Sequence, residues 1–247
     1  MNTERRISLE PGFVLHRKPY RDTSLLLEVF TGRYGRVGLV AKGARRPRSA
    51  LKGLLQPFQP LLLSWTGRGE LRTLTGAEPA ERPLFPAGPA LAGGFYLNEV
   101  LLRLVERHDP QPDLYPVYAR TVSALTRGSD MEWTLRLFER DLLQCLGYGL
   151  LLGDEAEGGG PVQSGGRYWY HLERGPVPDQ GGGGIPVRGE TLLALASGLP
   201  PPDPQGRAEA KLLMRNALRL YLGDKPLASR ALFRQFAGSK RPQPSGE

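Results

Sequence analysis

The chain has 247 residues, of which 40% are hydrophobic and 23% are charged. This composition is typical of a globular protein with one or two domains. No run of roughly 18 apolar residues is present, and the N-terminus lacks the apolar core of a signal peptide. The single cysteine, Cys145, excludes an internal disulfide framework and a cysteine-based zinc site. We therefore expect a cytoplasmic protein that makes no contact with a membrane.

The formal net charge of +8 is concentrated in the first third of the chain. Residues 1–80 hold 14 Lys and Arg against 6 Asp and Glu, whereas the remaining residues hold 19 of each kind. Between residues 33 and 52 no acidic residue occurs. A dense cationic segment favours binding of a polyphosphate such as nucleic acid, although a solvated loop in an arginine-rich protein is the alternative. The seven basic residues are Arg33, Arg36, Lys42, Arg45, Arg46, Arg48 and Lys52.

Residues 10–78 have the pattern of a small β-domain. Short apolar or alternating runs are separated by turn-forming Gly, Pro and Asp residues. Five short strands in about 70 residues are typical of a closed barrel, and the five-stranded OB-fold is the best candidate. The basic segment then covers the end of the third strand and the long loop after it. The predicted strands are Phe13–His16, Leu25–Phe30, Val37–Ala41, Pro60–Trp65 and Leu71–Thr75.

From about Pro89 the apolar residues follow a helical period. We predict one helix from residue 89 to residue 108, one over 114–125, and one that Ser129 or Asp130 caps and Gly147 ends. These three helices are expected to form a bundle. A short helix over 189–197 and an amphipathic helix over 207–222 follow, and residues 240–247 are expected to be disordered.

Residues 150–190 differ from the rest of the chain. Two glycine runs, 158–160 and 181–184, flank the aromatic sequence at 168–170. This pattern predicts two poorly ordered loops around a hairpin-like piece. Neither glycine run has the spacing of a phosphate-binding motif.

The helix over 207–222 carries a basic residue at every fourth position of one face. Such a stripe can be the solvated face of a packed helix or a second contact for nucleic acid or a partner. Its members are Arg207, Lys211, Arg215 and Arg219.

No catalytic constellation is recognisable. The sequence has no nucleophile elbow, no Walker lysine motif and no His-Glu-x-x-His. Asp154, Glu155 and Glu157 could contribute to a nuclease metal site, but they lie in a glycine-rich loop. The sequence therefore favours a binding protein over an enzyme and predicts no catalytic residue, metal or cofactor.

Several segments resemble the RecO family of bacterial recombination-repair mediators. They cover most of the chain in the family's order, and only residues 150–190 match poorly. Many members of the family carry two Cys-x-x-Cys pairs in that region, where this chain has no cysteine, so we expect no zinc. The matching segments are YRDTSLLLEVF (20–30), GRV (35–37), LVAKGAR (39–45), SALKGLLQPFQPLLL (49–63), GRGELRTL (67–74), YLNEVLL (96–102), LGYG (146–149) and YLGDKPLASRALFRQF (221–236).

The resemblance implies an α+β protein with two domains. Residues 1–80 would form the five-stranded OB-fold barrel and residues 81–247 a mainly α-helical domain, with 150–190 as a loop-rich, zinc-free insertion. It implies binding of single- and double-stranded DNA, annealing of complementary strands, and cooperation with RecR to load RecA onto strands coated by single-strand binding protein. These activities would take place at the nucleoid and need no cofactor.

The predicted DNA-binding set consists of the seven basic residues of 33–52 together with Arg68. Phosphate contacts are blind to sequence, as a mediator acting anywhere in a genome requires. Tyr34, Phe58 and Trp65 are available for stacking on bases, but each fits the barrel core equally well. Two rival functions remain open: a nuclease, and an RNA-binding OB-fold protein.

The family's helical domain also binds the acidic, Phe-ending tail of single-strand binding protein. Recognition of that tail requires an apolar pocket and a cation for the terminal carboxylate. Arg136 lies at the matching position of the family's site, with Leu135 beside it and Arg140 one turn further on. The alternative for both arginines is an ion pair on the helix surface with a neighbouring carboxylate.

Overall fold

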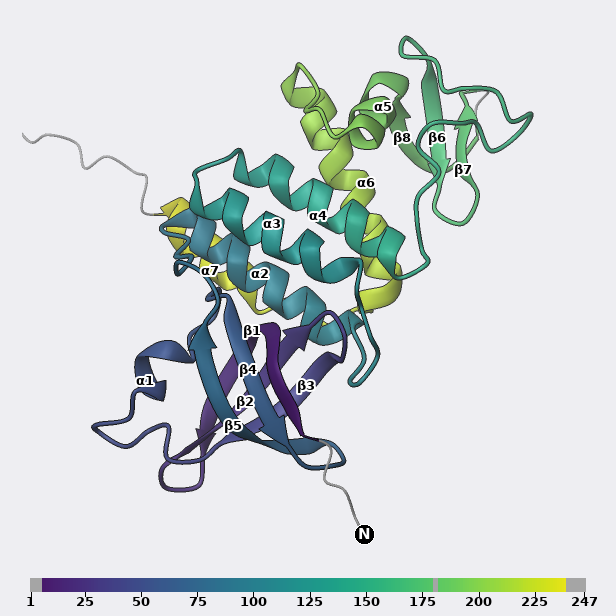
Figure 1. Cartoon of the computed structure of the whole chain (residues 1–247). Coiled ribbons are helices and arrows are strands. Elements are labelled where there is room, and N and C mark those ends of the chain that lie inside the picture. The colour runs from purple at the N-terminus through teal and green to yellow at the C-terminus, as the bar shows by residue number, and fades with distance from the viewer. Residues whose placement is uncertain (1–5, 180–181, 239–247) are drawn as a thin grey trace, which may run out of the picture. The chain divides into compact units, whose positions relative to one another are not determined.

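The computed structural model describes residues 6–179 and 182–238 (Figure 1). These residues form two compact units. One unit contains the described residues of 1–129 and of 226–247, and the other contains the described residues of 130–225. The second unit is therefore inserted into the sequence of the first. The division into two domains after residue 80 is inferred from the change of sequence pattern, and it stays a prediction.

The first unit contains the predicted five-stranded barrel, which is closed in the order β1-β2-β3-β5-β4. Neighbouring strands are antiparallel except β3 and β5, which are parallel. The expected α+β class, with an N-terminal barrel followed by a helical part, is confirmed. The strands are β1 (Ile7–Tyr20), β2 (Ser24–Thr31), β3 (Gly35–Ala41), β4 (Leu61–Thr66) and β5 (Leu71–Pro79).

Strand β1 is much longer than the predicted run of four residues. It spans 14 residues because the register shifts between Ile7 and Glu10 and again between Val14 and His16, which lets it pair with both β2 and β4. Gly12 resembles a turn signal in the sequence but lies within the strand. A Cβ at this position would approach the carbonyl oxygen of Phe30 to 3.1 Å, so the close packing favours glycine.

The barrel core consists of inward-facing apolar side chains. Alternate residues of β2, β3 and β4 are buried, as the period of two predicts. The connection from β3 to β4, predicted as a loop, contains one helical turn, α1 (Leu51–Leu54). The largest fully buried members of this core are Trp65, Leu27, Leu39, Leu55, Leu61 and Leu63.

Three helices complete the first unit: α2 (Pro89–Leu104), α3 (Leu114–Thr126) and α7 (Ser229–Gly238). Helix α2 ends before the predicted residue 108, because Val105 is extended and the following loop bonds to the barrel. In that loop the amide of His108 donates to the carbonyl of Arg36 at 3.0 Å, and the amide of Gln111 donates to the carbonyl of Gly32 at 2.8 Å.

Asn98 links the barrel to α2 and α3. Its amide nitrogen donates to the carbonyl oxygen of Leu15 on β1 at 2.8 Å, and its amide oxygen accepts from the hydroxyl of Tyr118 at 2.7 Å. All the atoms of this link are buried. Burial raises the pKa of Tyr118, so its hydroxyl keeps the proton that it donates.

Helix α7 was not predicted. The carboxylate of Glu99 on α2 accepts hydrogen bonds from the backbone amides of Ala228 and Ser229, each at 2.8 Å, and pairs with Arg103. A carboxylate at a helix N-terminus satisfies amides that lack a partner within the helix. The segment predicted to be disordered, 240–247, lies outside the described residues.

The second unit contains three helices and a small sheet. Of the two predicted caps of α4, Ser129 and Asp130, the N-cap is Asp130. Its carboxylate accepts a hydrogen bond from the amide of Trp133. Asp203 caps α6, which begins at Pro204 and not at residue 207, since proline is favoured in the first turn of a helix. The helices are α4 (Met131–Cys145), α5 (Gly189–Ser197) and α6 (Pro204–Leu222).

The insertion 150–190 is more regular than predicted. It contains a three-stranded antiparallel sheet in the order β7-β6-β8, where only one hairpin was expected, because residues 185–188 add a third strand to the aromatic strand β6. The glycine at 181 lies outside the described residues. The strands are β6 (Arg167–His171), β7 (Gly175–Pro178) and β8 (Ile185–Arg188).

The three helices predicted as one bundle are divided between the units. Helices α2 and α3 pack with each other and α2 packs with α7, whereas α4 packs with α5 and α6. Over the residues that the structure describes, no helix is long and apolar enough to cross a membrane.

We predict that Asn98→Leu lowers the free energy of unfolding of the first unit by roughly 2–4 kcal/mol, because two buried polar groups lose their partners. Urea denaturation followed by circular dichroism measures this change. Tyr118→Phe removes only one of the two hydrogen bonds and should cost about 1 kcal/mol. Equal losses in the two variants would mean that the bond to Leu15 contributes nothing.

Candidate nucleic-acid interface

The closed barrel separates the predicted DNA-binding residues into two groups. In the β2–β3 hairpin, Thr31 pairs with Gly35 at one end and Leu25 pairs with Ala41 at the other. Seven strand residues span roughly 20 Å. Arg33 and Arg36 therefore lie at the end opposite to the residues from Lys42 onward.

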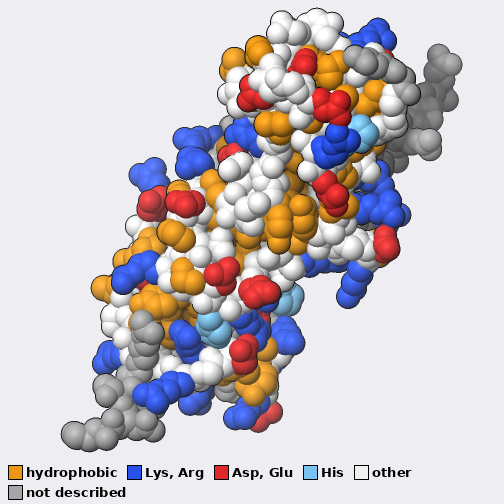
Figure 2. Space-filling view, turned by 90° about the vertical axis from the view of Figure 1, so that its right-hand side faces the viewer, with side chains coloured by type: hydrophobic (Ala, Val, Ile, Leu, Met, Phe, Trp, Pro, Cys, Tyr) orange, Lys and Arg blue, Asp and Glu red, His pale blue; other side chains and the backbone are white. Residues whose placement is uncertain are grey.

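Arg33, Arg36 and Arg68 belong to what we call the mixed-charge end, formed by the turns 32–34 and 67–70 and the loop 105–113. Here acidic side chains neutralise the basic ones. Glu28 lies 3.8 Å from Arg36 and also pairs with Arg107, which pairs with Glu70 at 3.0 Å. On the face shown in Figure 2, acidic and basic side chains lie side by side over the barrel.

Arg36 has a role within the fold. Its guanidinium is largely buried and donates a hydrogen bond to the carbonyl oxygen of Leu102, near the end of α2. Burial lowers its pKa and Glu28 acts against this shift. Arg33 is exposed and lies 3.7 Å from the buried carboxylate of Glu10. Burial raises the pKa of Glu10, and Arg33 opposes this effect.

The other five predicted residues gather at the opposite end of the barrel. They lie in the loop 42–50 and in α1, and all five side chains are exposed. We call this region the basic end and define it as residues 16–23 and 42–53. The five residues are Lys42, Arg45, Arg46, Arg48 and Lys52.

The structure adds three cations that sequence reasoning missed. They are Arg17 and Lys18, at the end of β1, and Arg21, in the turn 21–23. This turn contacts the loop 42–50, which we call the basic loop. The amide of Arg45 donates to the carbonyl of Thr23 at 2.8 Å. The basic end thus contains eight Lys and Arg residues and a single acidic residue, Asp22.

Arg45 holds the two segments of the basic end together. Its Nη1 donates to the carbonyl oxygens of Arg21 and Asp22 at 3.2 and 3.3 Å. Arg17 makes a similar contact, at 3.4 Å, with the carbonyl oxygen of Leu55 after α1. These bonds hold the surrounding cations on one surface. An excess of positive charge on exposed side chains is suited to the phosphates of nucleic acid.

The aromatic residues considered for stacking on bases lie elsewhere. Trp65 and Phe58 are buried in the core. Tyr34 packs edge-on against Trp65, with 5.5 Å between ring centroids. These three rings therefore contribute to packing of the barrel and its adjoining helices.

The residues predicted to bind the peptide tail lie on α4. Leu135 is buried, and Arg136 is 14% exposed and pairs with the buried carboxylate of Glu139 at 2.6 Å. Arg140 donates to the carbonyl oxygens of Leu195 and Ala196 at the end of α5. Arg140 therefore supplies a partner for carbonyls that the end of a helix leaves unsatisfied.

Ion pairs engage three members of the basic stripe on α6. Arg207 pairs with Asp130, Lys211 with Glu132 at 3.1 Å, and Arg219 with Asp224 at 3.0 Å. Arg215 is exposed. The pairs with Asp130 and Glu132 connect α6 to the beginning of α4, which agrees with the alternative of a packed helix face.

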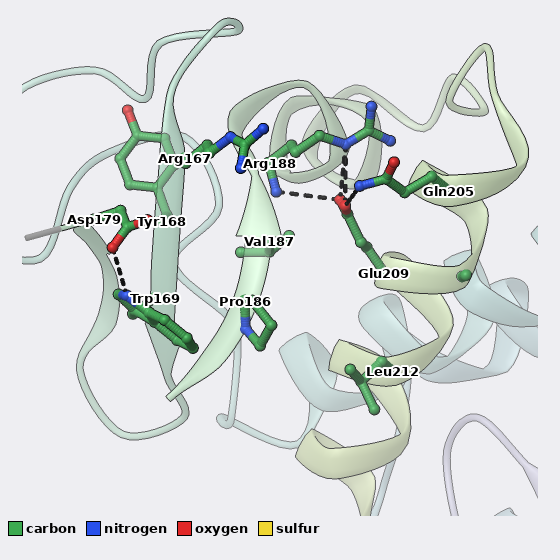
Figure 3. A pocket seen from close by; sticks show the side chains of 11 residues that line it. Arg167, Tyr168, Trp169, Asp179, Pro186, Val187, Arg188, Gln205, Glu209 and Leu212 are labelled. Carbon is green, nitrogen blue, oxygen red and sulfur yellow. Dashed lines mark hydrogen bonds and ion pairs between the residues drawn. The ribbon is translucent and has the colours of Figure 1, made fainter. Parts of the chain in front are cut away.

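A pocket of about 470 Å³ lies between β8 and the first half of α6 (Figure 3). Arg188 points from β8 toward α6 and forms ion pairs with Glu190, Asp203 and Glu209. The hydrogen bonds from Arg188 lower the pKa of Asp203 to about 2. Two arginines and two carboxylates line the pocket, which therefore lacks the positive excess of the basic end.

Of the three carboxylates weighed as nuclease ligands, Asp154, Glu155 and Glu157, the last two have separate partners. Glu155 accepts from the hydroxyl of Tyr168 at 3.0 Å, and Glu157 pairs with Arg174. Within the described part of the chain, no group of three or more His, Cys, Asp and Glu side chains could hold a metal ion.

Comparison with known proteins assigns the chain to a family. The family model described as "Recombination protein O N terminal" matches residues 6–82, and the model described as "Recombination protein O C terminal" matches residues 87–231. The chain belongs to the RecO family. It is a DNA repair and recombination protein, and the resemblance seen in the sequence is confirmed.

Curated RecO proteins match nearly the whole chain. The DNA repair protein RecO of Nitrosococcus oceani is 53% identical over 94% of each chain. That of Alkalilimnicola ehrlichii is 52% identical over 96% of this chain and 94% of its own. That of Haemophilus influenzae is 47% identical over 92% of this chain and 96% of its own.

We predict that Arg140→Ala destabilises the second unit by about 1–2 kcal/mol, because carbonyl oxygens at the end of α5 lose a charged donor. Hydrogen exchange of the α5 amides should accelerate accordingly. Arg219→Ala is a matched control, since its exposed pair with Asp224 contributes little. Equal protection of α5 in the two variants would contradict this role of Arg140.

Proposed function

We propose that this RecO protein is a recombination mediator that works by binding and not by catalysis. It binds single- and double-stranded DNA, anneals complementary strands and, with RecR, helps to load RecA onto strands coated by single-strand binding protein. No cofactor is needed. Membership of the RecO family supports the general function, and the basic end is the observation that supports the mode of DNA binding.

The proposed DNA surface is narrower than the predicted set in one respect and wider in another. Arg33, Arg36 and Arg68 are left out because they lie at the mixed-charge end. Arg17 and Lys18 at the end of β1 and Arg21 in the turn 21–23 are added because Arg45 holds this turn against the loop 42–50.

Electrostatics gives this surface the property that annealing requires. Two complementary strands are polyanions that repel each other, and a cationic surface screens this repulsion. The contacts would be made to phosphates, which are the same in every sequence. The binding would therefore be general for DNA and strongly dependent on salt.

We predict that the protein accelerates annealing of complementary oligonucleotides precoated with single-strand binding protein, in the absence of ATP. Arg46→Gln/Arg48→Gln should slow annealing and reduce the log–log salt slope for single-stranded DNA by about 1.4, or about 0.7 for each lost phosphate contact. Gel-based annealing and fluorescence anisotropy over a salt series measure the two effects.

Arg33→Gln/Arg68→Gln removes the same charge from the opposite end of the barrel and should leave both quantities unchanged. Equal effects of the two double variants would contradict the assignment to the basic end. Shortened strands on a denaturing gel would indicate a nuclease instead. Tighter binding to RNA than to DNA of the same sequence would indicate an RNA-binding protein.

The second proposed contact is with the acidic tail of single-strand binding protein, through Leu135 and Arg136. The Nε atom of Arg136 is buried and makes no hydrogen bond within the described residues. A terminal carboxylate would compete with Glu139 for the same guanidinium. Arg140 already donates a hydrogen bond to a carbonyl oxygen at the end of α5, so it would contribute less to binding of the tail.

We predict that Arg136→Ala lowers the affinity for a tail peptide about tenfold, since a charge-assisted hydrogen bond is lost. The affinity for naked DNA should not change. Isothermal titration with the peptide and anisotropy with DNA measure the two affinities. The matched control is Arg127→Ala, an exposed arginine of the first unit. If Arg136→Ala binds the peptide as tightly as the control does, Arg136 is not part of the tail site.

A further inference from the structure

The turn between β1 and β2 brings an aromatic ring and a guanidinium together at the basic end. Tyr20 is the last residue of β1, pairs with Ser24 and is partly exposed. The guanidinium carbon of Arg21 lies 5.2 Å from the centroid of the Tyr20 ring. Tyr20 is the single Phe, Trp or Tyr residue of the two segments that form the basic end, which also contain the exposed imidazole of His16.

The backbone at this position is held in an unusual conformation. Arg21 has a φ angle of +49°, in the left-handed region that side-chain-bearing residues rarely adopt. Its carbonyl oxygen and that of Asp22 accept hydrogen bonds from Arg45. Strained residues held by their surroundings are concentrated at ligand sites. The strain here sets the direction in which the Arg21 side chain leaves the turn, beside the Tyr20 ring.

The surrounding cations place this pair where the phosphates of a bound strand would lie. Arg17 and Lys18 precede Tyr20 in β1, and the basic loop lies against the turn through Arg45. A strand whose phosphates contact these cations would carry its bases past the Tyr20 ring. Aromatic rings and arginine planes are the groups on which proteins stack unpaired bases.

We propose that Tyr20 and Arg21 form a stacking site for one nucleobase of single-stranded DNA. This inference rests on the proposed DNA binding by the basic end and gives that surface a second component. The cations bind phosphates of single strands and duplexes alike. The Tyr20 ring acts only on single strands, because the bases of a duplex are already stacked on each other. Tyr20 therefore determines preference for single strands, and the cations determine the salt dependence.

The test compares Tyr20→Ala, Tyr20→Leu and Tyr20→Phe with the unchanged protein. Fluorescence anisotropy measures the Kd of each for three DNAs of equal length: a single strand, a single strand with abasic sites at every position, and a duplex. We expect the Ala and Leu variants to bind the normal single strand about tenfold more weakly. Their affinity for the abasic strand and the duplex should not change, and Tyr20→Phe should bind all three normally.

The abasic strand carries the same phosphate charge without bases, so it separates stacking from electrostatics. Equal weakening on all three DNAs would overturn the proposal, because the ring would then only support the turn. Unchanged binding of every DNA by the Ala and Leu variants would overturn it as well. Thermal unfolding midpoints of the variants serve as the check of folding.

Failure of this proposal is distinguishable from failure of the proposed function. The Arg46→Gln/Arg48→Gln variant changes the salt slope for all three DNAs if the basic end binds phosphates, whatever Tyr20 does. An unchanged slope in that variant would remove the DNA surface itself, and with it the stacking site.

Discussion

Closure of the five-stranded barrel is the constraint on which the candidate DNA surface depends. Strand β3 pairs with β2 on one side and with β5 on the other, so both of its ends have fixed places. The turn 21–23 and the loop 42–50 then emerge at one end, and the turns 32–34 and 67–70 emerge at the other. Cations distant in the sequence are brought together, and cations close in the sequence are separated by the length of a strand.

Several arginines of this protein donate hydrogen bonds to the backbone, and Arg45 does so while its side chain stays exposed. Arg36, Arg45 and Arg140 each donate to backbone carbonyls, near the end of α2, in the turn 21–23 and at the end of α5 respectively. A planar group with five donors can satisfy two neighbouring carbonyls at once, which lysine cannot do with the same geometry. A count of basic residues therefore overestimates the number available to a ligand, and it cannot say which ones are available.

In the proposed function, the two components of the DNA surface would serve different steps of annealing. Phosphate contacts hold strands of any sequence and reduce the repulsion between them. Stacking of a base on Tyr20, as proposed, would hold a strand only while that base is unpaired. Pairing with a complementary strand would remove this contact, and the duplex would then be bound more weakly than the strands from which it formed. Such a difference favours release of the product over release of the substrate.

The sequence by itself determined the barrel, most of the helices, the concentration of charge in the first third of the chain and the family. Hydrophobic periods of 2 and 3.6 residues, caps and turn residues act over short distances along the chain, and these signals are visible in the sequence. Local sequence patterns did not determine the length of β1, the third strand of the small sheet or helix α7. The bulges in β1, the added edge strand and the helix N-terminus that bonds to Glu99 all depend on partners elsewhere in the chain.

The tertiary structure also decided which arginines face solvent and which serve the fold. Arg45 contacts the carbonyl of a residue 24 positions earlier, and Asn98 contacts one 83 positions earlier. Local sequence patterns do not reveal such pairs, because the side chain that donates the hydrogen bond looks like any other polar side chain in the sequence. The basic end is visible in the sequence as a charge excess, but its borders exist only because the barrel closes and Arg45 ties one segment to the other.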